Sequence, residues 1–292
     1  MTESAVQTFT VGEGDDLITY DVRGDLTSAT DERPVLFLFG SPMDAVGFGT
    51  LAGHFTDRPV VTYDPRGAAR NPTATGPMTP EQHAEDLHRV IDALGVGPVD
   101  CFGSSGGAVN LLRLAELHPD DVRRIVAHEP PTLAMLPDRA AATKALEDMA
   151  TTYQSSGDGP AMAKFVALVM HDGEITDDYL AQPAPDPAKF GMSAEDDGVR
   201  TSPLMRNMPS CNEYTPDVTA LQALGDRLTI GVGATSGQQL AARGGRSVAA
   251  ALGVEPVVFP GGHGGFTGGE YGYPADEPDA FAATLHEVLD GS

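Results

Sequence analysis

Residues 98–118 of the 292-residue chain read PVDCFGSSGGAVNLLRLAELH, and this stretch decides the fold. Its first part, 99–102, is a short apolar run that predicts a buried strand, and 108–117 is an apolar segment that predicts a helix. The corner between them, GSSGG, fits the pattern G-x-S-x-G with Ser105 at its centre. Such a turn needs small neighbours, because larger flanking side chains would collide. The pattern predicts an exposed serine nucleophile, with a plain glycine-rich turn as the alternative.

The residue after this serine is expected to take part in the same chemistry. The amide of Gly106 comes near the start of the helix 108–117, where unpaired backbone N–H groups favour a negative charge. An oxyanion formed when Ser105 attacks a carbonyl group can be held there. Ser104 is interpreted only as a small residue that the corner tolerates.

Strands and helices alternate along most of the chain. Further apolar runs, each expected to be a strand, lie at 34–40, 58–64, 122–129, 227–233 and 255–261. Segments with helical periodicity, capping residues or both separate most of them, at 43–55, 79–95, 238–252 and from Pro278 onward. This order predicts the α/β class, with a mostly parallel, doubly wound sheet that has helices on both faces. A hairpin of 5–11 and 17–23 would add antiparallel strands at one edge.

The alternation breaks after 122–129. Residues 132–216 become helical and irregular, with helices expected at 139–153 and 160–171, and 183–216 is rich in Pro, Met and Asp. We therefore predict a core domain formed by 1–131 and 217–292, and an inserted helical cap formed by 132–216.

Composition limits the possible partners. The net charge is −24, from 18 basic and 42 acidic residues, which disfavours nucleic acid and anionic membrane surfaces. Two cysteines, Cys101 and Cys211, give no disulfide framework. The first residues lack the basic and apolar regions of a secretory signal, and no window reaches the apolar length of a membrane span. We expect a cytoplasmic protein with a small-molecule substrate, and the oligomeric state is left open.

Four motifs in this order resemble those of the α/β-hydrolase family: FGSP at 39–42, YDPRGAAR at 63–70, GSSGG at 103–107 and FPGGHGGF at 259–266. The likeness covers 5–131 and 217–292, whereas 132–216 resembles family caps only in position and helical character. In this family the loop after the third strand supplies a second oxyanion amide, usually from HGxP, which implies the amide of Ser41 here. Phe39 stands in place of the family's histidine.

The resemblance also implies a histidine base on the loop after the last strand, where His263 stands between glycines. An imidazole is suited to activate a serine hydroxyl near neutral pH. The acid that the family usually places after the penultimate strand is missing, because GATSGQQ at 233–239 has no carboxylate. Some hydrolases of this fold place the acid after an earlier strand, which implies Glu129. A glutamate paired with the cap or an arginine, and a serine–histidine dyad, are the alternatives.

The predicted function is hydrolysis of a carboxylic ester or lactone of a small, mainly apolar molecule. Seven of the ten methionines lie between Met135 and Met208. Such a cluster is typical of an adaptable apolar pocket, and the alternative is that the methionines fill gaps in a loosely packed insertion. Expected substrate contacts are Phe39, Phe165, Val169, Leu204 and Phe266. No metal or cofactor motif is found, so none is expected. Alternatives are a lyase, cyclase or acyltransferase of the same fold that acts on a natural-product intermediate, and a non-catalytic small-molecule-binding protein.

Overall fold

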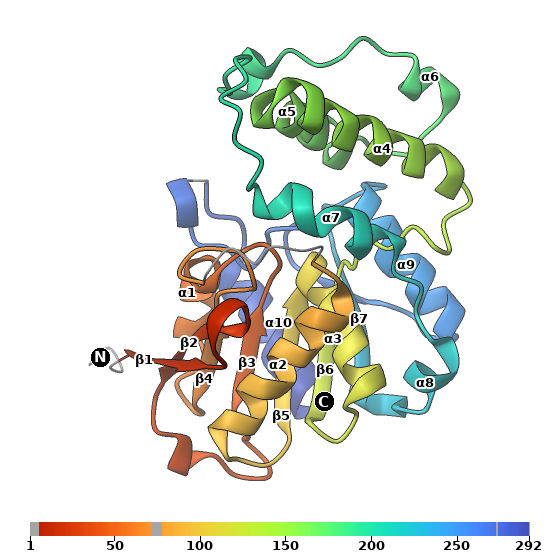
Figure 1. Ribbon diagram of the computed structural model, residues 1–292. Coiled ribbons are helices and arrows are strands. Elements are labelled where there is room, and N and C mark those ends of the chain that lie inside the picture. The colour runs from red at the N-terminus through yellow and green to blue at the C-terminus, as the bar shows by residue number, and fades with distance from the viewer. Residues whose placement is uncertain (1–5, 72–77, 273, 292) are drawn as a thin grey trace.

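The computed structural model describes residues 6–71, 78–272 and 274–291, which form one eight-stranded sheet with helices around it (Figure 1). The strand order is β1-β2-β4-β3-β5-β6-β7-β8. Strands β1 and β2 are antiparallel to each other, β2 is antiparallel to β4, and all other neighbours are parallel. The mostly parallel α/β sheet and its edge hairpin are therefore confirmed. The strands are β1 (Val6–Val11), β2 (Ile18–Arg23), β3 (Leu36–Phe39), β4 (Val60–Tyr63), β5 (Val99–Ser104), β6 (Val122–His128), β7 (Leu228–Gly233) and β8 (Val257–Phe259).

Helices cover both faces of this sheet. The α-helices of the described residues are α1 (Gly49–Gly53), α2 (Pro80–Leu94), α3 (Gly106–Leu117), α4 (Arg139–Ser156), α5 (Asp158–Val169), α6 (Asp177–Leu180), α7 (Pro203–Glu213), α8 (Val218–Gln222), α9 (Leu240–Leu252) and α10 (Pro278–Asp290). Buried side chains of α2, α3, α8 and α9 pack on one face, and those of α1 and α10 on the other. The sheet is thus doubly wound.

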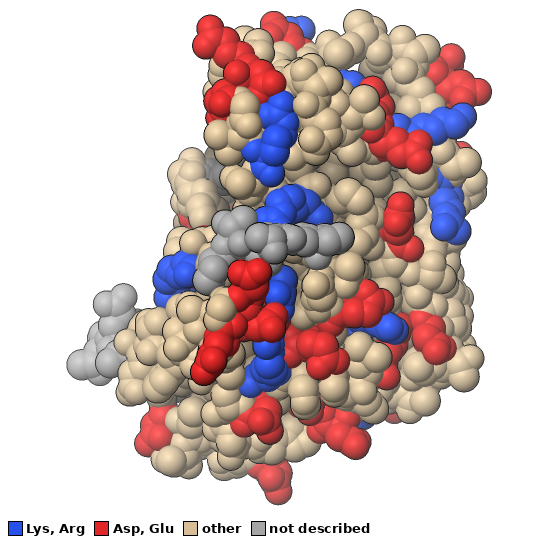
Figure 2. All heavy atoms as spheres, viewed as in Figure 1, with Lys and Arg blue, Asp and Glu red and all other residues tan. Residues whose placement is uncertain are grey.

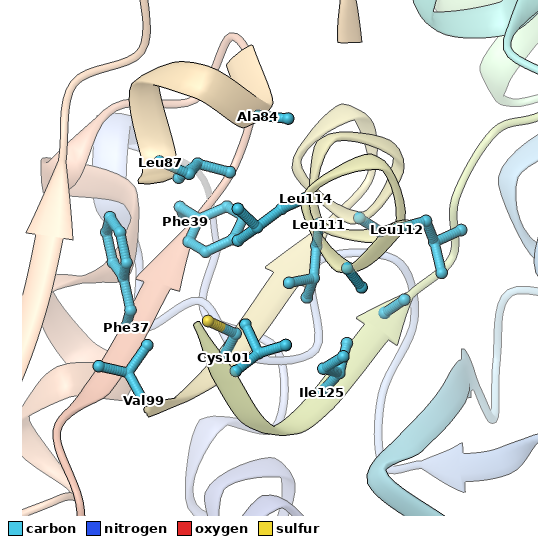
Figure 3. Close-up of a cluster of buried hydrophobic side chains, with 14 of the residues drawn as sticks. Phe37, Phe39, Ala84, Leu87, Val99, Cys101, Leu111, Leu112, Leu114 and Ile125 are labelled. Atoms are coloured by element: carbon cyan, nitrogen blue, oxygen red, sulfur yellow. The ribbon is translucent and has the colours of Figure 1, made fainter. Parts of the chain in front are cut away.

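Side-chain alternation along the central strands divides the core into these two layers. On β3, Phe37 and Phe39 point into the α2–α3 layer, where Leu87 and Leu114 lie nearby (Figure 3). Leu36 and Leu38 belong to the opposite layer. Successive strand residues face opposite sides of a sheet, so a strand that is apolar at every position is buried on both. This explains the unbroken apolar run at 34–40.

Between β6 and β7 the chain forms α4, α5, α6 and α7, which lie above the rest of the molecule in Figure 1. These helices share their own apolar cluster, in which Met149 and Leu168 meet Leu240 from the first turn of α9. An ion pair between Asp138 and Arg243 also joins this segment to α9. We call residues 132–216 the cap segment; its boundaries stay a prediction.

Local details of the helices differ from the expectations. The segment 43–55 forms a 3-10 turn at Ala45–Phe48 followed by the short helix α1. Helix α7 lies inside 183–216, where no helix was expected, although Pro203 occupies its first turn. Pro209 lies inside this helix, and because an interior proline argues against a helix, none is predicted from the residues of this segment.

The surface matches the strongly acidic composition. On the face shown in Figure 2, acidic side chains are spread over the core domain and the cap segment, with basic side chains among them. This distribution is that of a solvated surface. None of the described helices is both long enough and apolar enough to cross a membrane.

We expect Gly107→Ala to destabilise the protein by about 3 kcal/mol, at the upper end of the range for overpacking. A Cβ at this position would lie 2.6 Å from the Gly40 Cα and from the Phe39 carbonyl oxygen, and backbone cannot move aside as a flexible side chain would. Gly53→Ala is the matched control, because nothing lies within 4 Å of its added Cβ. Urea denaturation of the two variants tests this; equal stability of both would contradict it.

Candidate active site

Ser105 occupies the sharp turn between β5 and α3. Its backbone has φ 57° and ψ −125°, a combination that a residue with a side chain rarely adopts and that costs about 1–3 kcal/mol. The turn is held because the Ser105 amide donates to the His128 carbonyl oxygen at 3.0 Å. A Cβ on Gly103 would lie 2.7 Å from the Gly107 carbonyl oxygen, so the corner requires glycine there. The small residues of GSSGG are thus explained by the turn itself.

Glu129 and His263 form a direct pair. Glu129 follows β6, its side chain is buried, and its Oε2 lies 2.6 Å from Nδ1 of His263 on the loop after β8. Its other oxygen, Oε1, accepts a hydrogen bond from the Gly233 amide at 2.7 Å. Both carboxylate oxygens are therefore held, and the structure brings together two residues that are 134 positions apart in the sequence.

The surroundings keep this carboxylate ionised. Burial by itself raises the pKa of Glu129, but the hydrogen bond from His263 and the nearby His263 and His128 rings outweigh burial and lower the pKa to about 2. An ionised carboxylate accepts only, so Nδ1 of His263 carries the proton of this bond. In the neutral ring, Nε2 is then an unprotonated acceptor, which is the state required of a general base.

We expect Glu129 to make the stability of the protein pH-dependent in the acid range. Its folded-state pKa of about 2 lies below the ordinary 4.5, so the stabilisation is fully present above pH 4.5 and is lost as the pH falls toward 2. The difference corresponds to about 3 kcal/mol. Urea denaturation of the wild type and of Glu129→Gln across this window should show their stabilities converging as the pH falls; a constant difference would contradict the assignment.

His128 lies beside this pair but is fully buried. Burial lowers its pKa to about 4, so the ring is neutral at pH 7. Its Nδ1 lies 3.3 Å from the Ser104 hydroxyl, and its ring centroid is 6.3 Å from that of His263. The His128 ring therefore packs beside the His263 ring, as a buried neutral group.

The two residues that carry the predicted oxyanion amides lie next to each other. A Cβ on Gly106 would lie 2.4 Å from the Ser41 carbonyl oxygen, so these two backbone segments touch. The loop that carries Ser41 is fastened further along, where the Ala45 amide donates to the Asp64 carboxylate at 3.1 Å. Asp64 belongs to the YDPRGAAR motif, and its carboxylate holds this loop by a hydrogen bond.

A cavity of about 660 Å³ joins these groups. Ser41, Ser105, Gly106 and His263 all line it, and Glu129 lies behind His263. This volume falls within the range of roughly 300–1,000 Å³ that is typical of small-molecule sites. The structure therefore places the predicted nucleophile, base and oxyanion donors around one space.

Four of the five predicted substrate contacts line the cavity. Phe165 and Val169 come from α5, Leu204 from α7, and Phe266 from the loop after His263. The prediction for Phe39 is wrong. Its side chain is fully buried in the layer between the sheet and α2–α3 (Figure 3), and Phe39 does not line the cavity. Its ring packs edge-on against Phe37 and Tyr63 instead.

Several polar lining residues were not predicted. Asn207 and Asn212 come from α7, and Gln239 precedes α9. The only available signal was the presence of two amides in a methionine-rich segment, because α7 itself was not expected.

A cluster that could hold a metal ion lies elsewhere among the described residues. His88, His118 and Asp121 have potential ligand atoms within 4.8 Å of one another. Each imidazole already has a carboxylate partner, Asp121 at 2.7 Å from His88 and Glu85 at 2.9 Å from His118, and the two rings are stacked. None of these residues lines the cavity.

Comparisons by sequence point to one family. The family model for the alpha/beta hydrolase fold matches residues 33–175. An uncharacterized hydrolase, YraK of Bacillus subtilis, is 34% identical over 144 residues, which is 47% of this chain and 51% of YraK. A putative carbamate hydrolase, RutD of Caulobacter segnis, is 34% identical over 114 residues, or 38% of this chain and 42% of RutD. The chain thus matches about half or less of the length of these relatives.

Solved structures match over almost the whole chain. An esterase from Thermogutta terrifontis has a TM-score of 0.66 at 18% identity, covering 98% of both chains. Proline iminopeptidase from Mycobacterium smegmatis has a TM-score of 0.60 at 17% identity, also covering 98% of both. These neighbours have different activities, so at this identity they establish the fold alone. By its sheet, by the sequence match over residues 33–175 and by these neighbours, the chain has the α/β-hydrolase fold.

Proposed function

We propose that the protein is a serine hydrolase that cleaves a carboxylic ester or lactone of a small, mainly apolar molecule. The observation that carries this proposal is the hydrogen bond between the buried Glu129 and His263, at the edge of the cavity that Ser105 also lines. A nucleophile, a base and a group that orients the base are the parts that acyl transfer to a serine requires.

In the proposed reaction, the Ser105 oxygen attacks the substrate carbonyl carbon while Nε2 of His263 takes the hydroxyl proton. The negative charge that forms on the carbonyl oxygen is stabilised by the amides of Ser41 and Gly106. The C–O bond to the leaving group then breaks, and His263 returns the proton to the departing alkoxide. A water molecule, deprotonated by His263, attacks the acyl-enzyme, and collapse of the second intermediate releases the acid and restores Ser105.

The cavity lining supports an apolar substrate. Phe165, Val169, Leu204 and Phe266 supply apolar surface, and Met43, Met170 and Met208 add flexible side chains. The C-terminal end of α5 and the helix α7 both contribute to this lining, so the cap segment forms part of the proposed substrate site.

The proposal is tested with a panel of p-nitrophenyl esters of increasing acyl length, γ- and δ-lactones, and aryl carbamates. Carbamates are included because relatives are named putative carbamate hydrolases, and a carbamate offers the same carbonyl to Ser105. We expect ester or lactone turnover with a preference for apolar acyl chains. If only the carbamates are turned over, the proposed substrate class of esters and lactones is wrong and is replaced by carbamates. Transfer of the acyl group to an added alcohol without hydrolysis would favour an acyltransferase, and no reaction with any compound would favour a binding protein.

A further inference from the structure

A short chain of buried hydrogen bonds reaches the oxyanion loop from the cap segment. Nε2 of His83 on α2 lies 2.8 Å from Oδ1 of Asn207 on α7, and Nδ2 of Asn207 donates to the Ser41 hydroxyl oxygen at 2.9 Å. All three side chains are almost fully buried. The fold thus joins α2, the cap segment and the loop after β3 at one point.

The tautomer of His83 determines which atom donates and which accepts in each of these two hydrogen bonds. Burial lowers the pKa of His83, so its ring is neutral at pH 7 and carries one proton. The ring's Nδ1 is buried and has no partner among the described residues. If Nδ1 held the proton, a buried N–H would be left unpaired, which is less favourable than an unpaired acceptor. The proton therefore belongs on Nε2, which donates to Oδ1 of Asn207.

It follows that the amide of Asn207 presents its NH₂ group to Ser41. The Ser41 oxygen accepts this bond, and within the described part of the chain no acceptor is found for the hydroxyl proton of Ser41. With the opposite amide orientation, the Ser41 hydroxyl would instead donate its proton to the amide oxygen of Asn207. The buried His83 thus fixes the orientation of the Asn207 amide, and this orientation leaves the Ser41 hydroxyl proton available to another acceptor.

Ser41 is well placed to use that proton in the cavity. Its Cβ lies 3.4 Å from the position that a Cβ on Gly106 would occupy, and both residues line the cavity with Ser105. We propose that the Ser41 hydroxyl is a third hydrogen-bond donor to the oxyanion, and that Asn207 is a positioning residue that holds it in the donor orientation. This inference rests on the proposed acyl transfer at Ser105.

The expected effect of Ser41→Ala is a fall in kcat of about 10²-fold with KM changed little, because the hydroxyl bond strengthens only as the oxyanion forms. The backbone amide of residue 41 is retained in this variant. Asn207→Ala should lower kcat in the same way but less. If Asn207 acts only through Ser41, the double variant should be no slower than Ser41→Ala alone.

Asn207→Asp is the sharpest variant. The introduced carboxylate has no donor, so it would accept the Ser41 proton and withdraw it from the substrate while keeping the contact. We expect a loss of kcat at least as large as that of Ser41→Ala. Ser210→Ala is the matched control. Ser210 also lies on α7, and its hydroxyl bonds to the backbone carbonyl oxygens of Met78 and Asn207. It does not line the cavity, and the Asn207 side-chain amide keeps both of its bonds, so its loss should leave kcat unchanged.

A readout that does not require activity is the tautomer of His83, measured by ¹⁵N NMR and assigned with His83→Gln. Protonated Nε2 is expected; protonated Nδ1 would overturn the proposed direction. Unchanged kcat in Ser41→Ala, or fully additive losses in the double variant, would also overturn the inference. If these results occur while Ser105→Ala is inactive, only the role of Ser41 fails. If Ser105→Ala keeps its turnover, the proposed function itself fails.

Discussion

Ser105→Ala is expected to lower kcat by about 10⁶-fold, as loss of the nucleophile does in a serine protease. The physical reason is that, among the described residues that line the cavity, Ser105 alone places a hydroxyl on the strained turn between β5 and α3, next to Gly106, which lines the same cavity. The removal of a single oxygen atom leaves the turn and the cavity intact. The fold and the substrate affinity should therefore be retained.

The measurement is steady-state turnover of the best ester or lactone from the panel, with circular dichroism as the check on folding. Ser104→Ala is the matched control, since it removes the neighbouring hydroxyl, which bonds to His128 and not to His263. Its loss of turnover should be far smaller. A Ser105→Ala variant with more than trace activity would rule out a covalent route through this residue.

Glu129→Gln is expected to lower kcat by about 10⁴-fold, the size of the effect seen when an acid of this kind is made neutral in a protease. The carboxylate accepts from Nδ1 of His263 at 2.6 Å, which leaves Nε2 free to act as the base. A neutral amide in the same place can donate to Nδ1 and so favour the wrong tautomer. It also removes the negative charge that stabilises the imidazolium formed during the reaction.

The control for this variant is Glu116→Gln, because the Glu116 side chain is also buried and hydrogen-bonded, to Tyr214 and to Arg113. It lies outside the cavity, so stability should fall while kcat stays near that of the wild type. A rate for Glu129→Gln close to that of the wild type would mean that the site works as a Ser105–His263 dyad. In that case Glu129 would have a structural role only.

The parts of the site that follow local rules were predictable from the sequence. The turn at Ser105 is such a case, because an apolar strand, small corner residues and an apolar helix are all adjacent in the chain. Glu129 was reached differently, from the resemblance and from the absence of a suitable carboxylate between Gly231 and His263. The structure places its Oε2 2.6 Å from Nδ1 of His263, and the catalytic role of the pair stays a proposal.

The errors have physical causes as well. Phe39 was predicted to contact the substrate, but in the run LFLF of β3 every residue is apolar, so the pattern does not tell which face of the sheet each side chain takes. The contact between Asn207 and Ser41 joins positions 166 residues apart. Asn207 lies on α7, which was not predicted because it contains Pro209. No local pattern encodes such a contact, since it depends on how the cap segment packs on the sheet.

The central claim is that His263, held by Glu129, activates Ser105 beside the oxyanion donors. Labelling with a fluorophosphonate, followed by intact mass and peptide mapping, tests it most directly, because the probe reacts with activated serines without requiring the natural substrate. We expect one adduct per chain, on Ser105, formed much more slowly in Glu129→Gln and absent from Ser105→Ala. No adduct on the folded wild-type protein, or an adduct on another residue, would contradict the account.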